Sequence, residues 1–197
     1  MNKVYVLGNG GHANSVIEVI RSLGPDNIVQ LPYDDVLSDK SVEIDSLDRN
    51  YDVHHAIAIG DITFRKVVAS SAFCQRTTPY RLLSLSAYIA IGAKIGRGTV
   101  VMPGATIRSH AVIGDYSIIN TGSVIEHNCT VGSFVNVSPG AILCGRVSIA
   151  DSCFVGAGSV IIDKVSICSG VVVGAGAVVL KDIHEPGTYL GVPARRV

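Results

Sequence analysis

The stretch "IRSHAVIGDYSIINTGSVIEHNCTVGSFVNV", residues 107–137, repeats one pattern every six residues. Every sixth residue, from Ile107 to Val137, is aliphatic, and the residue four places after each of these is small or β-branched. The pattern extends outward in both directions, from Ile89 to Val179, through sixteen consecutive hexads. A run of this length without a slip is not chance, so it decides the fold of this part of the chain.

A six-residue repeat is typical of a β-solenoid, in which each hexad supplies one short strand and one corner and the aliphatic residue points inward. Three strands make a turn of about 18 residues, so the run predicts about five turns stacked ~4.8 Å apart. Some glycines recur every eighteen residues, and we expect them at corners that require a positive φ. These glycines are Gly96, Gly114 and Gly132 on one side, and Gly156 and Gly174 on another.

The first 80 residues differ in kind. Residues 3–24, "KVYVLGNGGHANSVIEVIRSLG", predict an apolar strand, a glycine turn and a helix with a buried apolar face. Gly8, Gly10 and Ala13 match G-x-G-x-x-A, a spacing that lets backbone amides at a helix N-terminus approach a phosphate. That motif alone does not establish a nucleotide site.

Two further strands are predicted at residues 28–31 and 56–59, and each runs into a loop with carboxylates. These loops share one sheet edge, where the carboxylates could bind ribose or base donors, or could be solvated turn residues. The space is half that of a dinucleotide domain, so a mononucleotide, with or without a sugar, fits better than NAD. The loop residues are Asp34, Asp35, Gly60 and Asp61. The sequence thus predicts a small Rossmann-like α/β domain over residues 1–80 and a parallel β-helix over residues 81–197.

Composition excludes several classes of function. The 197 residues include sixteen basic and sixteen acidic residues, so the net charge favours neither nucleic acid nor an anionic membrane as a partner. The apolar start at residues 4–7 is too short for a signal peptide, and no later stretch approaches a membrane span. We therefore expect a cytoplasmic protein.

Neither the cysteines nor the histidines predict a metal site. The five cysteines form no C-x-x-C pair and have no histidine at a zinc-like spacing, so we expect reduced, packed thiols. The predicted β-helix contains only His110, His127 and His184, which are not spaced to converge on one ion. No metal is expected.

Six stretches spread over both predicted domains resemble one family. The whole chain resembles bacterial sugar acetyltransferases of the NeuD type, which include enzymes that N-acetylate nucleotide-linked 4-amino sugars. The resemblance implies a left-handed β-helix, acetyl-CoA as co-substrate, a nucleotide-linked amino sugar as acceptor, and a homotrimer with the cofactor in clefts between subunits. The stretches are "GNGGHA" (8–13), "YDD" (33–35), "AIAIGD" (56–61), "INTGSVIEHNC" (119–129), "NVSPGAILCG" (136–145) and "GVPAR" (191–195).

The resemblance also implies roles for individual residues. His127 stands at the position of the general base, with Asn128 beside it, and the Gly145 amide stands where the thioester oxygen is bound. The positions implied for acetyl-CoA are Asn136, Gly145, Ala157, Gly174, Ala175, Pro193 and Arg195. The positions implied for the nucleotide sugar are Gly10, Gly11, His12, Asp34, Asp35, Gly60 and Asp61.

The chemistry needs few groups. An amine must lose a proton as it attacks a thioester, and imidazole, which titrates near neutrality, is suited to accept it. The tetrahedral oxyanion needs a preorganised donor. Because Gly145 follows His127 by eighteen residues, periodicity alone places the two on adjacent turns.

Two positions depart from the family pattern. Asn128 stands where the family commonly has Asp or Glu, and Asn136 stands where it often has a second histidine. A neutral amide gives an imidazolium less support than a carboxylate does, which favours N-acetylation over O-acetylation because an amine is the stronger nucleophile. Three alternatives stay open: a sugar O-acetyltransferase, a catalytically silent sugar-nucleotide-binding homologue, and an acyltransferase with another small acceptor.

Overall fold

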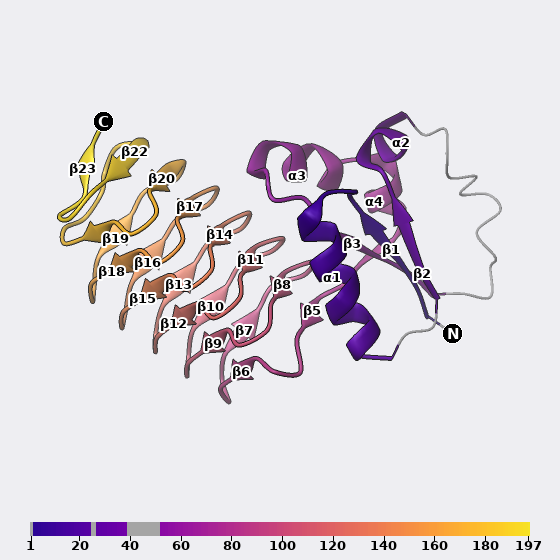
Figure 1. Ribbon diagram of the computed structural model, residues 1–197, viewed down its shortest axis with the longest axis horizontal. Helices are drawn as coiled ribbons and strands as arrows, with labels where there is room; N and C mark the ends of the chain where they lie inside the picture. The colour runs from indigo at the N-terminus through magenta and orange to yellow at the C-terminus, as the bar shows by residue number, and fades with distance from the viewer. Residues whose placement is uncertain (1, 25–26, 39–51) are drawn as a thin grey trace. The chain divides into compact units, whose positions relative to one another are not determined.

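The computed structural model describes residues 2–24, 27–38 and 52–197, and it divides the chain into two compact units, Met1–Leu82 and Leu83–Val197 (Figure 1). Each unit is described by itself below. Within the described ranges, no helix is both long and apolar enough to cross a membrane.

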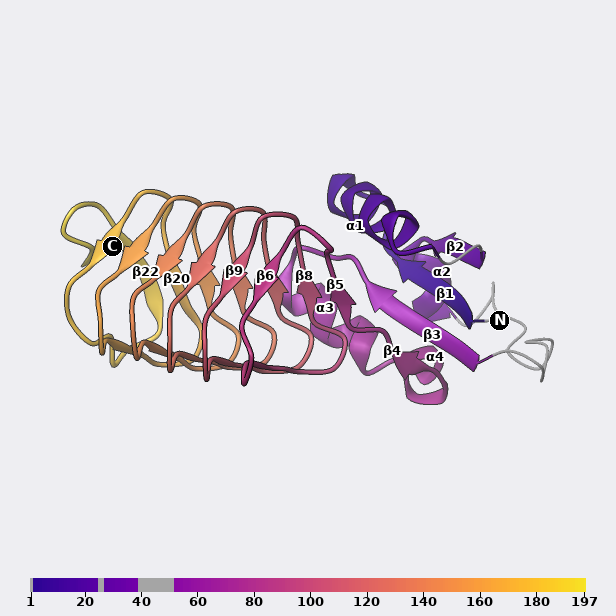
Figure 2. The same ribbon diagram turned by 90° about the horizontal axis from the view of Figure 1, so that it is seen from below.

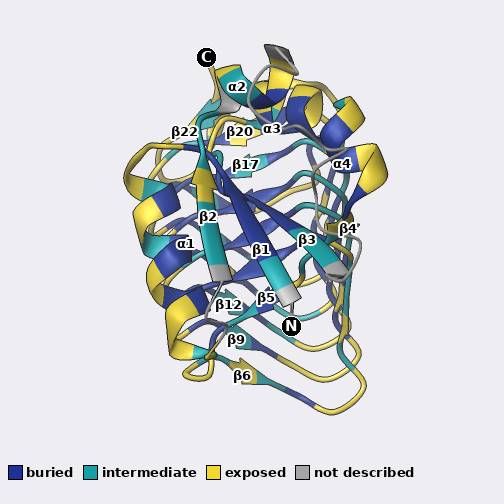
Figure 3. Cartoon of the chain, turned by 90° about the vertical axis from the view of Figure 1, so that its right-hand side faces the viewer, coloured by how far each residue is buried: buried dark blue, intermediate teal, exposed yellow. Residues whose placement is uncertain are grey.

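The first unit is a four-stranded parallel sheet with helices, in the order β2-β1-β3-β4. The central strand β1 is largely buried between β2 and β3 (Figure 3). Its elements are β1 Asn2–Leu7, α1 Gly11–Ser22, β2 Asn27–Leu31, α2 Tyr33–Ser38, β3 Asp52–Ile57, α3 Ile62–Ala69, α4 Ala72–Arg76 and β4 Thr78–Pro79. The chain passes from β1 to β2 on one side and then to β3 on the other, so β1 and β3 flank the point where the strand order reverses.

Details of the predicted α/β unit needed correction. The third strand ends at Ile57 and not at Ile59, because the carbonyls of Ile59 and Gly60 turn from the sheet to accept hydrogen bonds from Arg65. Asp34 and Asp35 do not lie in a loop but in the first turn of α2. At that end of the helix their negative charges interact favourably with the positive end of the helix dipole.

His55 is fully buried in β3 and is held in one tautomer. Thr77 donates its hydroxyl proton to the Phe73 carbonyl (2.9 Å), so its oxygen accepts from Nδ1–H of His55 (2.8 Å). Burial, with a smaller contribution from His54, lowers the pKa of His55 from 6.5 to about 4. The imidazole is therefore neutral at neutral pH.

We expect the stability of this unit to fall as the pH drops from 6.5 to 4. In that window the unfolded chain binds a proton at His55 that the folded chain does not, whereas above 6.5 the two states are protonated alike. The loss attributable to His55 is about 3 kcal/mol. His55→Asn keeps a donor for Thr77 but cannot titrate, so urea unfolding at pH 7 and pH 5 should show a smaller loss in the variant. Equal losses in both proteins would contradict this assignment.

The second unit is a three-sided parallel β-helix, whose successive turns are seen stacked in Figure 2. One face has five strands: β7 Lys94–Ile95, β10 Val112–Ile113, β13 Thr130–Val131, β16 Ser148–Ile149 and β19 Ser166–Ile167. A second has six: β6 Tyr88–Ile89, β9 Thr106–Ile107, β12 Val124–Ile125, β15 Ile142–Leu143, β18 Val160–Ile161 and β21 Val178–Val179. The third has eight: β5 Leu82–Leu83, β8 Val100–Val101, β11 Ile118–Ile119, β14 Asn136–Val137, β17 Phe154–Val155, β20 Val171–Val173, β22 Gly187–Leu190 and β23 Arg195–Arg196.

The hexad prediction is confirmed for the interior. Ile119, Ile125 and Val131 are at most 1% exposed, and residues eighteen apart pair in register, as Ile113 does with Val131. The unit has about six turns and not five, because β5 and β22, which lie before and beyond the counted hexads, extend the stack on the eight-stranded face.

The reason given for the recurring glycines was wrong. Gly96, Gly114 and Gly132 do not have a positive φ; a Cβ at any of them would come within 2.8 Å of backbone atoms of the next turn. They are required by the close approach of two turns. The left-handed corner positions belong to other residues, among them Gly104, Gly122 and Asn128.

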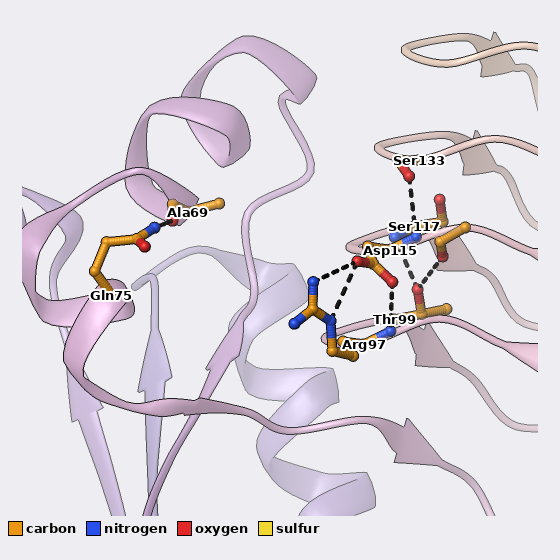
Figure 4. Close-up of polar contacts among 8 residues, drawn as sticks. Ala69, Gln75, Arg97, Thr99, Asp115, Ser117 and Ser133 are labelled. Carbon is orange, nitrogen blue, oxygen red and sulfur yellow. Dashed lines mark hydrogen bonds and ion pairs between the residues drawn. The ribbon is translucent and has the colours of Figure 1, made fainter.

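Polar ladders join neighbouring turns at the corners between the five- and eight-stranded faces (Figure 4). Asp115 accepts from the backbone N–H of Arg97 (2.7 Å) and from its guanidinium, and the Asp115 N–H donates to Ser133 Oγ (3.1 Å). Such partners are eighteen residues apart, so the corners reinforce the same register as the buried aliphatic stack.

Candidate functional site

His127 lies on the corner that leads from β12 on the six-stranded face to β13 on the five-stranded face. Its side chain is exposed, and its carbonyl accepts a hydrogen bond from the Arg146 N–H of the next turn (3.0 Å). The buried neighbours Ile125 and Val131 anchor the strands before and after it. The corner therefore presents the imidazole outward from a rigid frame.

Asn128 has two structural tasks beside this imidazole. Its φ is 61°, in the left-handed region that Asn tolerates better than most residues. Its Oδ1 lies 3.0 Å from Nδ1 of His127, and because a carbonyl oxygen only accepts, Nδ1 must carry the proton. The lone pair is then on Nε2, the nitrogen free to act as a base.

Gly145 lies one turn beyond His127, directly against the ring. A Cβ built on Gly145 would be 2.8 Å from Nε2 of His127 and 2.9 Å from its Cε1. The φ of Gly145 lies outside the left-handed region, and the equivalent corner positions hold Ser109 and Asp163, so the backbone itself does not demand glycine. Glycine is needed here because the imidazole occupies the space of a side chain.

The Gly145 amide also has the property that an oxyanion donor requires. Within residues 52–197, which the structure describes without a gap, no group accepts a hydrogen bond from this N–H. A donor that is fixed by the β-helix backbone and has no protein partner can bind developing negative charge without reorganising. His127 and Gly145 thus place an imidazole and an unpaired amide donor on adjacent turns.

The other residues assigned to acetyl-CoA lie elsewhere on the β-helix. Ala157, Gly174 and Ala175 are on the corner that precedes the six-stranded face, whereas His127 is on the corner that follows it. Asn136 belongs to β14 on the eight-stranded face and is 7% exposed. One chain therefore does not bring these residues together with His127.

The C-terminal positions converge on a cavity of their own. Pro193 and Arg195 line a cavity of about 120 Å³ together with Lys181 and Tyr189. Lys181 and Arg195 give its wall two basic side chains, beside the carboxylate of Asp182, which accepts from the Ser166 N–H (2.8 Å). Gly174 has a packing role as well, because a Cβ there would overlap the side chain of Leu190.

The glycine loop of the first unit borders a cavity of about 250 Å³. Gly8 is fixed by the fold, because its φ is 137° and a Cβ would lie 2.7 Å from the Ala58 carbonyl oxygen. At Gly10, Gly11 and Gly60, a Cβ would meet nothing within 4 Å. At these three positions the packing does not require glycine, and the space beside the backbone is open to a ligand.

This cavity lies at the carboxyl ends of β1 and β3, where open α/β sheets bind ligands. It is lined by Gly8, Asn9, Gly10, Ala58, Ile59, Asp61 and Phe64. Of the residues assigned to the nucleotide sugar, only Gly10 and Asp61 line it, and the Asp61 carboxylate caps α3 by accepting from the Phe64 N–H (2.8 Å).

Sequence reasoning missed Phe64 as a wall of this cavity. Its side chain is 51% exposed, and the available signal was an aromatic residue three places after a helix-capping aspartate. His12 follows the glycine loop, but burial first, and the charge of Arg65 second, lower its pKa from 6.5 to about 4. His12 is thus neutral at neutral pH, and its Nε2 is buried.

No group of three or more His, Cys, Asp or Glu in the described part of the chain is arranged to hold a metal ion. The five cysteines are free, and burial raises the pKa of the Cys74 thiol to about 11. Cys74 is therefore a packed thiol and not a reactive one.

Comparison with known proteins gives the same two-part organisation. The model of the PglD N-terminal domain matches residues 3–72, and that of the bacterial transferase hexapeptide (six repeats) matches residues 92–127. A comparison with curated proteins finds no match.

Solved structures match over the full length of the chain. The acetyltransferase domain of PglB from Neisseria gonorrhoeae has a TM-score of 0.90 and 29% identity, with 100% of both chains covered. PerB from Caulobacter crescentus, solved with CoA and GDP-perosamine, has a TM-score of 0.88 and 30% identity, covering 100% of this chain and 98% of PerB. WeeI from Acinetobacter baumannii has a TM-score of 0.88 and 26% identity, with 100% of both chains covered.

Two variants of a perosamine N-acetyltransferase from Caulobacter crescentus, solved with CoA and GDP-perosamine, also match, and the PglB domain has been solved with acetyl coenzyme A as well. The resemblance seen in the sequence is thus confirmed by identity, fold and coverage together. Because both family models match in order along the chain and PerB is 30% identical over almost its whole length, this protein belongs to the NeuD/PglD-type family of hexapeptide-repeat acyltransferases.

Proposed function

We propose that this protein is a cytoplasmic enzyme that transfers the acetyl group of acetyl-CoA to the amino group of a nucleotide-linked amino sugar, for bacterial surface glycan synthesis. The observation that carries the proposal is the triad of His127, Asn128 and Gly145 on one corner of the β-helix. Asn128 leaves Nε2 of His127 as the basic nitrogen, and Gly145 both makes room for that ring and offers an amide donor.

The reaction then needs only these groups. Nε2 of His127 accepts a proton from the amino group as its nitrogen attacks the thioester carbonyl carbon. The carbonyl oxygen becomes an oxyanion that accepts a hydrogen bond from the Gly145 N–H. When the C–S bond breaks, the amide forms and the CoA sulfur leaves, and the imidazolium returns the proton to that thiolate.

The cavity of the first unit supports a nucleotide-linked acceptor. The amides at the start of α1, beside the open positions Gly10 and Gly11, suit a diphosphate because a helix N-terminus attracts anions. The opposite wall, with Ile59 and Phe64, is apolar and half-exposed, as a base or sugar requires. Asp34 and Asp35 are proposed to bind hydroxyl or base donors.

Two features support a trimer. Residues assigned to acetyl-CoA lie on different edges of one β-helix, so a cleft that combines them needs a second copy. The outward side chains of the six-stranded face form an exposed or partly exposed, mainly apolar stripe: Tyr88, Thr106, Val124, Ile142, Val160 and Val178. The five-stranded face instead presents mostly Lys, Thr and Ser. We propose that copies pack through the apolar stripe and bind acetyl-CoA beside it.

The proposal is tested by incubating the protein with acetyl-CoA and a panel of UDP-, GDP- and dTDP-linked amino sugars, and measuring CoA release and product mass. We expect the amino sugars linked to one of these nucleotides to gain an acetyl group. The product should resist cleavage by hydroxylamine, as an amide does. A product cleaved by hydroxylamine would instead be an ester and would favour O-acetylation. Binding of acetyl-CoA without turnover on any member of the panel would favour the silent homologue.

Replacing Asn128 by Asp should leave kcat unchanged or raise it. Asp tolerates the left-handed φ of this position, and an ionised acceptor strengthens the hydrogen bond to the imidazolium that forms during reaction. Steady-state kinetics on the identified acceptor measure the effect, with Ser152→Asp as control because that corner residue also has a positive φ, 63°. A large loss confined to Asn128→Asp would show that the amide has a role of its own.

A further inference from the structure

Arg65 is a buried charged residue that the proposed reaction does not use. It is 1% exposed, and its Nη1 donates to the carbonyls of Ile59 (2.7 Å) and Gly60 (3.1 Å). Burial lowers its pKa to about 10, opposed in part by the charge of Asp61, so the guanidinium stays charged at neutral pH. Burying a guanidinium is unfavourable unless its donors are satisfied and its charge is compensated, so this placement needs an explanation.

The two carbonyls belong to the segment that forms one wall of the cavity in the first unit. Ile59 lines the cavity directly, and the chain then passes through Gly60 to Asp61 and Phe64, which also line it. The Arg65 N–H donates to the Asp61 carbonyl (2.9 Å), closing the first turn of α3. Arg65 thus contacts this wall twice: its side chain donates to the Ile59 and Gly60 carbonyls, and its backbone N–H donates to the Asp61 carbonyl.

The location of the Arg65 charge, and not only its hydrogen bonds, affects the cavity of the first unit. The Arg65 charge acts on His12, which follows the glycine loop, and His12 is neutral at neutral pH. The positive charge near this loop therefore resides on Arg65. In a buried environment of low dielectric, such a charge acts on an anionic ligand over a longer range than it would in water.

We infer that Arg65 is a positioning residue for nucleotide-sugar binding: its buried guanidinium fixes the Ile59–Gly60 carbonyls, and through them the cavity wall that carries Asp61 and Phe64. This inference rests on the proposed function for the identity of the ligand. It requires no contact between Arg65 and the substrate.

The test compares Arg65→Met, which keeps the length of the side chain without charge or donors, with Arg65→Lys, which keeps the charge and a donor. We expect Arg65→Met to raise KM for the nucleotide sugar at least tenfold and to leave KM for acetyl-CoA unchanged, and Arg65→Lys to recover most of the loss. Arg76→Met, at an exposed position of the same unit, is the matched control and should behave like the wild type. Thermal unfolding of each variant is recorded alongside.

Several results would overturn the inference. They are an unchanged KM for the nucleotide sugar in Arg65→Met, equal shifts of both KM values, or a fall in thermal stability and kcat alone, which a merely structural residue would give. If no amino-sugar nucleotide is acetylated, the proposed function fails separately, and calorimetry with UDP, GDP and dTDP decides the inference. Weaker binding to Arg65→Met than to the wild type would then support it, and equal or absent binding to both would overturn it.

Discussion

Replacing His127 by Ala is expected to lower kcat by at least a hundredfold, with KM for acetyl-CoA nearly unchanged. A positioned general base contributes about 10²–10⁴ in rate. In the structure Asn128 accepts from Nδ1–H, which leaves the lone pair on Nε2, the nitrogen proposed to accept the proton. His127 is exposed on a corner and contributes nothing to the buried aliphatic stack, so the variant should fold as the wild type does.

The measurement is single-turnover and steady-state kinetics with the acceptor identified by the panel. His184→Ala is the matched control, since His184 is an exposed histidine of the same unit that lies outside the residues assigned to the site. It should retain near-normal turnover. Near-normal turnover in His127→Ala would exclude His127 as the base. His127 would then be an exposed corner residue without a catalytic role.

The interior of the β-helix was predictable from sequence because one inward residue in six must be aliphatic on every turn. Ile107, Ile125 and Leu143 repeat that requirement on the six-stranded face, and all three are fully buried. The corners were less predictable. A glycine selected for a positive φ, such as Gly104, and one selected for close approach of two turns, such as Gly114, look alike in a sequence.

The pairing of His127 with Gly145 was also predictable, because a separation of eighteen residues places both on one corner. The role of Asn128 was only half visible. The sequence shows that Asn128 is a neutral partner for the imidazole, and the structure adds that its φ of 61° gives a conformational reason for Asn at that position. Asn136 lies on the eight-stranded face and His127 on the corner between the other two faces, as their spacing of nine residues, one and a half hexads, requires.

In the α/β unit, sequence reasoning located the glycine loop and, on the opposite wall of the cavity, Asp61, but it did not locate Phe64. Phe64 and Arg65 lie on the first turn of a helix that caps itself with Asp61, and only packing shows that one ring faces the cavity while the neighbouring guanidinium is buried. Alternation between an exposed and a buried side chain on consecutive helical residues has no distinctive signal in so short a segment.

Replacing Gly145 by Ala is expected to lower kcat about as far as the loss of His127 itself, roughly a hundredfold or more. The added methyl carbon would lie 2.8 Å from Nε2 of His127, which is shorter than the van der Waals contact of a carbon with a nitrogen. The imidazole must therefore rotate away and break its contact with Asn128. The backbone accepts the change, since the equivalent positions hold Ser109 and Asp163. The amide N–H is retained, so the variant tests the placement of the base and not the oxyanion donor.

A double-mutant cycle separates this mechanism from a general effect of the methyl group. If Gly145→Ala acts by displacing the imidazole, adding it to His127→Ala should cost little further activity, because the group it displaces is already gone. Thermal unfolding should show the double variant at least as stable as Gly145→Ala alone, since the clash is relieved. If the two substitutions instead multiply, each lowering kcat by its full factor, the methyl group must act on the thioester or on the amide. Glycine would then be required at this position for the cofactor and not for the base.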